Sequence, residues 1–126
     1  MTGEHTALPS PSRLVHEPAR LAILTVLSSC ALADFVFLQR ATGLSKGNLS
    51  VQLTTLEQAG LVIIHKDIVD KKMRTTAKLS KRGISEVAEY WETMDEIRAQ
   101  TVQSEQHRSS KRPLPTRVGL APNPAG

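Results

Sequence analysis

The segment from Ser45 to Ala59 carries side chains whose types and spacing suit hydrogen bonding to the bases of DNA. Leu49, Leu53 and Leu56 follow one another at intervals of four and three residues, so they share one helix face, which must be buried. The opposite face is small and polar. Short donors and acceptors of this kind let a helix enter the major groove and reach base edges. We therefore predict DNA contacts on this helix from Lys46, Asn48, Ser50, Val51, Gln52 and Thr54.

A second group of cations follows in a predicted turn at residues 70–73. Lys71, Lys72 and Arg74 would stand at the tip of a hairpin. Cations at such a tip can reach phosphates or the minor groove beside the helix, where they add affinity that is largely independent of base sequence. We predict that these three residues hold the flanking DNA backbone.

Patterns for catalysis or metal binding are missing from the sequence. It contains no Gly-x-Ser-x-Gly elbow and no phosphate-binding Gly-Lys-Ser/Thr loop. The single cysteine, Cys30, ends an apolar helix with no base nearby in sequence, which favours an inert thiol over a redox sensor. The four histidines have no ligand spacing, and His16 is read as a structural or interface residue. We predict no enzyme activity, no cofactor and no metal site.

The turn before the polar helix holds the signals that would position it. Gly43 can adopt the left-handed backbone that ends a preceding helix. Ser45 is a natural N-cap, because its hydroxyl can accept from the free backbone N–H groups of the first turn. Leu44 and Leu49 have the spacing of a hydrophobic staple. These signals together predict a helix-turn-helix.

Two supporting helices are expected earlier in the chain, after a possible helical turn at residues 13–16. Pro18 suits the first position of an apolar helix that frays at residues 28–30. The next helix is predicted over residues 31–42, with Asp34 near its positive end. It contains four consecutive apolar residues, 35–38, which a helix covered on one side cannot all bury. The remainder would meet the first helix, which we favour, or a partner chain or small-molecule cavity.

A hairpin and a long helix complete the predicted elements. Residues 61–69 are rich in β-branched side chains, and residues 74–79 form the returning strand. Ser80 then caps a final helix with Gly83 in its first turn. A helix of roughly 25 residues spans almost 40 Å, longer than a domain this small can cover. We favour dimerisation over packing on its own domain, through Ile84, Val87, Trp91 and Met94.

Length and composition favour one mainly helical domain. The 126 residues bury a modest core built from aliphatic side chains, since aromatic residues make up only 3%. Residues 39–82 hold nine Lys or Arg and three acids, a net charge of +6, whereas residues 83–106 hold one Arg and six acids, a net charge of −5. This difference in net charge suits a segment that binds nucleic acid followed by a helix that associates with another chain. Ordinary solvated surface would also explain it.

The predicted boundaries are a flexible lead at residues 1–12, a domain at 13–106 and a disordered tail at 107–126 that is rich in Arg, Ser, Lys, Pro and Gly. No stretch approaches the length of a membrane-spanning helix. No apolar run follows a basic start. We therefore expect a cytoplasmic protein.

The order of these elements resembles the winged helix-turn-helix transcriptional regulators of the ArsR and MarR type, and most closely small single-domain prokaryotic members. The likeness covers residues 14–90 and is carried by the Thr-Gly-Leu-Ser turn at 42–45, the leucine-patterned helix, the Gly-Leu exit at 60–61 and the basic hairpin. Relatives tend to have Pro where this chain has Met73, before an Arg-Thr pair kept here. The resemblance implies a mainly α fold with a small β-hairpin wing, and a homodimer that binds double-stranded DNA. Metal sensing, common in ArsR-type proteins, is not supported, and no small-molecule effector is identified.

We predict a sequence-specific DNA-binding transcriptional regulator. Helix 45–59 would read the major groove, and the wing at 61–79 would hold the flanking backbone or minor groove. The alternative is a winged-helix scaffold that binds another protein and not DNA. The positive reading segment and the acid-free helix face favour DNA.

Overall fold

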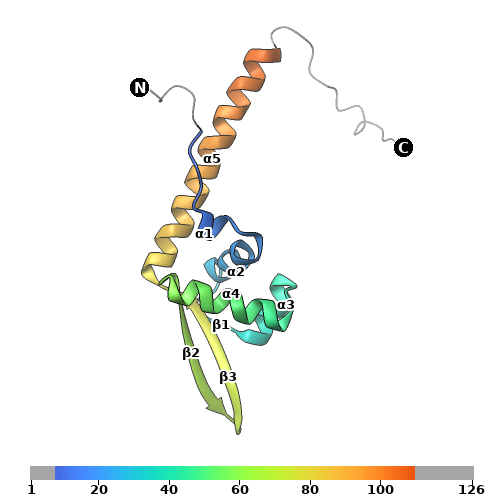
Figure 1. Cartoon of the computed structure of the whole chain (residues 1–126), viewed down its shortest axis with the longest axis vertical. Coiled ribbons are helices and arrows are strands. Elements are labelled where there is room, and N and C mark those ends of the chain that lie inside the picture. The colour runs from blue at the N-terminus through green and yellow to red at the C-terminus, as the bar shows by residue number, and fades with distance from the viewer. Residues whose placement is uncertain (1–7, 110–126) are drawn as a thin grey trace, which may run out of the picture. The chain divides into compact units, whose positions relative to one another are not determined.

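The computed structural model describes residues 8–109, and the side chains of residues 8–102 (Figure 1). Contacts divide the chain into a unit at Pro9–Met94 and a second unit that includes the described residues from Asp95 onward. The elements are α1 (Arg13–His16), α2 (Pro18–Ser28), β1 (Ala33–Asp34), α3 (Phe35–Thr42), α4 (Lys46–Gln58), β2 (Val62–Val69), β3 (Lys72–Leu79) and α5 (Lys81–Ser109). The predicted fold class, mainly α with a small hairpin, is confirmed.

The predicted terminal segments fall mostly outside the described residues. Residues 1–7 of the lead and 110–126 of the tail are not described. Helix α5 continues to Ser109, past the predicted domain boundary at residue 106. Among the residues that the structure covers, no helix has the length and apolar character needed to cross a membrane.

The core of the Pro9–Met94 unit lies where α2, α3 and α4 meet. Helix α2 buries Ile23, Leu24 and Leu27, and α3 buries Leu38. The three leucines predicted to share one face of α4 are 0–3% exposed. Pro18 occupies the start of α2, as predicted. The leucine pattern therefore fixes which side of α4 faces the solvent, because only one side of the helix can reach this core.

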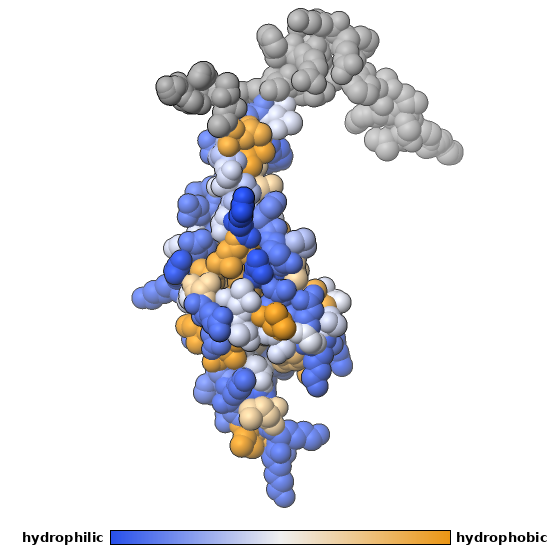
Figure 2. Space-filling model, viewed as in Figure 1, coloured by the Kyte–Doolittle hydropathy of each residue, from blue (hydrophilic) through white to orange (hydrophobic). Residues whose placement is uncertain are grey.

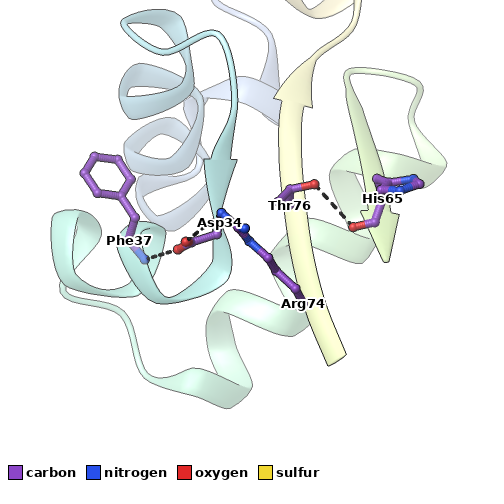
Figure 3. Close-up of polar contacts among 5 residues, drawn as sticks. All are labelled: Asp34, Phe37, His65, Arg74 and Thr76. Atoms are coloured by element: carbon purple, nitrogen blue, oxygen red, sulfur yellow. Dashed lines mark hydrogen bonds and ion pairs between the residues drawn. The ribbon is translucent and has the colours of Figure 1, made fainter. Parts of the chain in front are cut away.

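The sheet has a strand that the sequence did not predict. Its order is β1-β3-β2, and β1 pairs antiparallel with β3, placing Ala33 beside Ala77 and Asp34 beside Thr76. The helix predicted from residue 31 therefore begins only at Phe35. Asp34 has an extended backbone and its carboxylate accepts from the Phe37 N–H at 2.8 Å, so it is the N-cap and the helix cannot include it (Figure 3).

The hairpin turn is shorter than the predicted turn at residues 70–73. It consists of Asp70 and Lys71, whose φ angles of 52° and 66° are both left-handed. Two left-handed residues give the twist that a two-residue hairpin needs. Lys72 and Met73 consequently belong to β3, where they pair with Val69 and Ile68.

A junction joins the end of α4, the start of β2 and the first turn of α5. The Ser80 hydroxyl donates to the Gly60 carbonyl at 2.6 Å and accepts from the Gly83 N–H at 2.9 Å. The Ser80 N–H donates to the Leu61 carbonyl at 3.0 Å. Ser80 is thus the cap that the sequence predicted. A Cβ on Gly83 would overlap the Leu61 carbonyl oxygen, so the close approach requires glycine.

The first turns of α5 pack on their own domain. Val87 and Tyr90 are buried in the core, and Met94 packs against it. The Tyr90 hydroxyl lies 2.8 Å from Nδ1 of His16, which gives that histidine a structural contact. Ile84 and Trp91 are 60% and 43% exposed. Of the four residues predicted to form a dimer interface, Val87 is therefore buried within its own chain and Met94 is partly so, because both lie on the face of α5 that the core covers.

Candidate nucleic-acid interface

Helix α4 begins as the sequence predicted. The Ser45 hydroxyl accepts from the Asn48 N–H at 3.1 Å, and α3 ends at Gly43 with a φ of 74°. Leu49 is fully buried, and Leu44 packs against the same core. The cap and the staple therefore fix both the start and the rotation of α4.

The exposed face of α4 presents most of the side chains that we predicted to contact DNA. Lys46, Asn48, Ser50, Val51 and Thr54 are all exposed. The Thr54 hydroxyl donates to the Ser50 carbonyl at 3.0 Å, so its oxygen can still act as an acceptor. No acidic residue lies between Lys46 and Thr55, and the first is Glu57.

Gln52 differs from its neighbours because it is half-buried and bonded on both sides. Its Oε1 accepts from Nη1 of Arg20 in α2 at 3.0 Å. Its Nε2 donates to Oδ1 of Asn48 at 3.1 Å. Arg20 was not among the residues predicted from the sequence. The signal available was the presence of one cation in an otherwise apolar helix, which indicates a side chain that needs a polar partner inside the domain.

The outer half of the hairpin is open to solvent on both faces. Lys71, Lys72 and Arg74 are exposed, as are Ile68 at 67% and Met73 at 65%. Figure 2 shows apolar colour within a mainly hydrophilic hairpin. Ile68 and Met73 are directly paired across the strands, so they lie on the same face. The hairpin thus combines phosphate-binding cations with a small apolar surface.

One ion pair connects the hairpin to the helix-turn-helix. Nη2 of Arg74 in β3 lies 3.6 Å from Oδ2 of Asp34, the residue that caps α3 (Figure 3). On the neighbouring strand pair, the Thr76 hydroxyl donates to the His65 carbonyl at 3.4 Å. The Arg74 side chain is 55% exposed, so it can still present N–H groups to a phosphate.

A groove of about 880 Å³ lies between α4 and the hairpin, and Asp34 together with Phe35, Val36 and Gln39 of α3 also lines it. A second hollow of about 430 Å³ continues beside it and shares Ser50 and Thr75. The groove brings together residues that the sequence placed in two separate segments. It is lined by Lys46, Gly47 and Ser50 of α4 and by Met73, Arg74 and Thr75 of β3, while Thr54 lines the second hollow.

The favoured expectation, that the leftover apolar residues of α3 meet the first helix, is wrong for Val36 and Phe37, which are 55% and 48% exposed. Leu38 is buried and Phe35 packs against the core, whereas Val36 and Phe37 are exposed.

Cys30 is half-buried. Within residues 8–109, no three His, Cys, Asp or Glu side chains are grouped so that they could hold a metal ion.

Comparisons with known proteins agree with this geometry. A family model described as a winged helix DNA-binding domain matches residues 19–98, more than half of the chain. A transcriptional regulator homologue from Pyrococcus horikoshii OT3 has 28% identity and a TM-score of 0.67, covering 71% of this chain and 89% of its own.

Two further solved structures share the fold. NadR, solved in complex with 4-hydroxyphenylacetate, has 25% identity and a TM-score of 0.56, covering 78% of this chain and 71% of its own. A MarR family transcriptional regulator from Silicibacter pomeroyi has 19% identity and a TM-score of 0.55, covering 70% of this chain and 57% of its own. The resemblance drawn from the sequence is therefore confirmed at the level of the fold and of the winged helix.

Proposed function

Because the chain belongs to the winged helix DNA-binding domain family, we propose that it is a transcriptional regulator that places α4 in the major groove of double-stranded DNA. The observation that carries the proposal is the shared groove. It sets Lys46 and Ser50 of the exposed α4 face beside Arg74, the hairpin cation that lines the groove and pairs there with Asp34. A helix that reaches base edges and an arm that reaches phosphates are the two parts that sequence-specific binding requires.

The two parts have different tasks. Asn48, Ser50 and Thr54 present short polar groups on α4 and would meet base edges. A good base contact discriminates between base pairs by about 1–3 kcal/mol. Lys71 and Lys72 are exposed at the end of the hairpin and would meet phosphates. A phosphate contact positions the protein but does not select a sequence.

The experiment is a binding titration at several salt concentrations with genomic fragments retained by the purified protein. K72A should weaken binding to all duplexes alike and reduce the salt dependence by about one unit, because one phosphate contact is lost. T54A should instead change the ratio of affinities between the retained fragment and a scrambled one. Binding that ignores salt, or no binding to any fragment, would favour the protein-binding scaffold.

We further propose that the regulator acts as a homodimer whose copies read half-sites about one helical turn apart. Support comes from Ile84 and Trp91, two large apolar side chains exposed on α5. Sedimentation of the full chain tests this. I84E should shift the protein toward the monomer, whereas S85E beside it on the same exposed part of α5 should not. A wild-type chain that sediments as a monomer at all concentrations would contradict the proposal.

A further inference from the structure

A chain of side-chain hydrogen bonds runs from α2 to the exposed face of α4. Nε of Arg20 donates to the Leu14 carbonyl at 2.7 Å, which fixes the guanidinium. Its Nη1 donates to Oε1 of Gln52 at 3.0 Å. Nε2 of Gln52 then donates to Oδ1 of Asn48 at 3.1 Å, one helical turn away.

The chemistry of arginine sets the direction of every bond in this chain. A guanidinium has only donors, so the Gln52 atom that faces Arg20 must be the amide oxygen. The NH₂ group of Gln52 therefore points toward Asn48. A donor there requires an acceptor, so Asn48 must turn its own oxygen inward and its NH₂ group outward. The fixed cation in α2 thus determines which end of Asn48 is presented at the surface of α4.

The two residues that orient Asn48 are partly buried. Arg20 and Gln52 are half-buried, whereas Asn48 is exposed. The N–H of Arg20 donates to the Glu17 carboxylate at 2.8 Å, which fixes the start of α2. Asn48 is therefore oriented before any ligand arrives, and an oriented side chain loses less conformational freedom on binding.

We propose that Arg20 and Gln52 are positioning residues that make Asn48 a hydrogen-bond donor toward DNA, so that it selects guanine. This inference rests on the proposed function. Asparagine reads adenine through two bonds, in which its oxygen accepts from N6 and its NH₂ donates to N7. With its oxygen turned toward Gln52 and its NH₂ group outward, Asn48 presents a donor and not the acceptor-and-donor pair that adenine requires. Guanine offers two acceptors in the major groove, O6 and N7, which match the NH₂ group left outward.

The first arm of the test examines the free protein. Q52E keeps the shape of the side chain and accepts from Arg20, but it cannot donate to Asn48. The side-chain amide NMR signals of Asn48 should shift in Q52E and stay in place in Q58E, which makes the same charge change at the exposed end of α4. Unchanged Asn48 signals in Q52E would overturn the hydrogen-bond chain itself, whatever the protein binds.

The second arm selects duplexes from a random pool with the wild type, N48A, Q52E and Q58E. N48A identifies the base pair that Asn48 reads, as the position where preference disappears. At that position the wild type should select guanine, and 7-deazaguanine should lower the affinity about tenfold, within the range of a single base contact. Q52E should lose most of this penalty and accept adenine, while Q58E should behave as the wild type.

The outcomes separate the inference from the proposed function. Selection of adenine by the wild type at the Asn48 position, or an undiminished guanine preference in Q52E, would overturn the inference and leave the regulator intact. R20M should loosen the preference in the same way as Q52E, since Gln52 loses the donor that orients it. A pool from which the wild type enriches nothing would overturn both proposals.

Discussion

Helix α4 and the outer half of the β2–β3 hairpin lie on opposite sides of one groove, yet they are held in contrasting ways. Helix α4 has a buried leucine face, a serine cap and a polar link to α2. The outer hairpin is exposed on both faces, and the described contact that ties it to α3 is the pair between Arg74 and Asp34. Base selection needs a side chain fixed within about 0.5 Å, whereas attraction to phosphates tolerates an arm that adjusts.

The sharpest test of this comparison is the stability of the two regions. L56A removes a fully buried side chain from α4 and should lower the free energy of unfolding by about 2–5 kcal/mol. I68A on the hairpin should change it by less than about 0.5 kcal/mol, because that side chain is mostly exposed. Chemical denaturation followed by circular dichroism measures both. Equal losses would mean that the outer hairpin is as firmly held as α4.

The junction at Gly83 tests whether the fixed region extends to the base of the hairpin. G83A places a methyl group against the Leu61 carbonyl and should cost about 1–3 kcal/mol, as overpacking does. A88G, at an exposed position of the same helix, controls for helix propensity and should cost about 1 kcal/mol. Thermal unfolding of the two variants compares them. If G83A lowered the free energy of unfolding by less than A88G does, the junction would be as loosely held as the outer half of the hairpin.

The cap of α4 gives a smaller effect on the same side of the comparison. S45A removes the acceptor for the Asn48 N–H and should cost about 1 kcal/mol. S50A makes the same change in the exposed part of the helix and should leave stability within about 0.5 kcal/mol, while altering base preference. The free energy of unfolding and the base preference, measured on both variants, distinguish a residue that stabilises α4 from one that contacts DNA. A destabilised S50A with unchanged preference would contradict this separation.

The smallest expected effect comes from removing the ion pair between Arg74 of the hairpin and Asp34, the cap of α3. A double-mutant cycle of D34N and R74Q should give a coupling energy below about 1 kcal/mol, because the charged atoms are 3.6 Å apart and the Arg74 side chain is 55% exposed. The amide of Asn keeps an acceptor for the cap, so D34N isolates the charge. A coupling energy well above this limit would show that the ion pair fixes the hairpin.

Local signals in the sequence were sufficient for α4 and for most of the hairpin. The cap at Ser45 and the three leucines each depend on neighbours within one or two turns. Strand β1 could not be found in this way, because its two residues are extended only by pairing with Ala77 and Thr76, far along the chain. The turn at Asp70 and Lys71 lacks the glycine that usually marks a two-residue hairpin loop, so the predicted turn was too long.

Long-range contacts also determine the surroundings of two predicted sites, Gln52 and the apolar stripe of α5. Helical spacing placed Gln52 near the exposed face, but Arg20, 32 positions earlier, binds its oxygen. The stripe on α5 was assigned to a partner chain, but its own core covers Val87. In both cases the helical spacing was predicted, but the residues that pack against Gln52 and Val87 were not. A sequence pattern does not show which distant residue lies beside a given side chain.

The serine at position 80 has a mechanical consequence. Its hydroxyl hydrogen-bonds both to Gly60, after the end of α4, and to Gly83, in the first turn of α5. Its backbone N–H donates to the carbonyl of Leu61, the residue before β2. A displacement of the first turn of α5 would therefore be transmitted both to the end of α4 and to the base of the hairpin. The outer half of the hairpin, which Ser80 does not contact, would remain able to adjust.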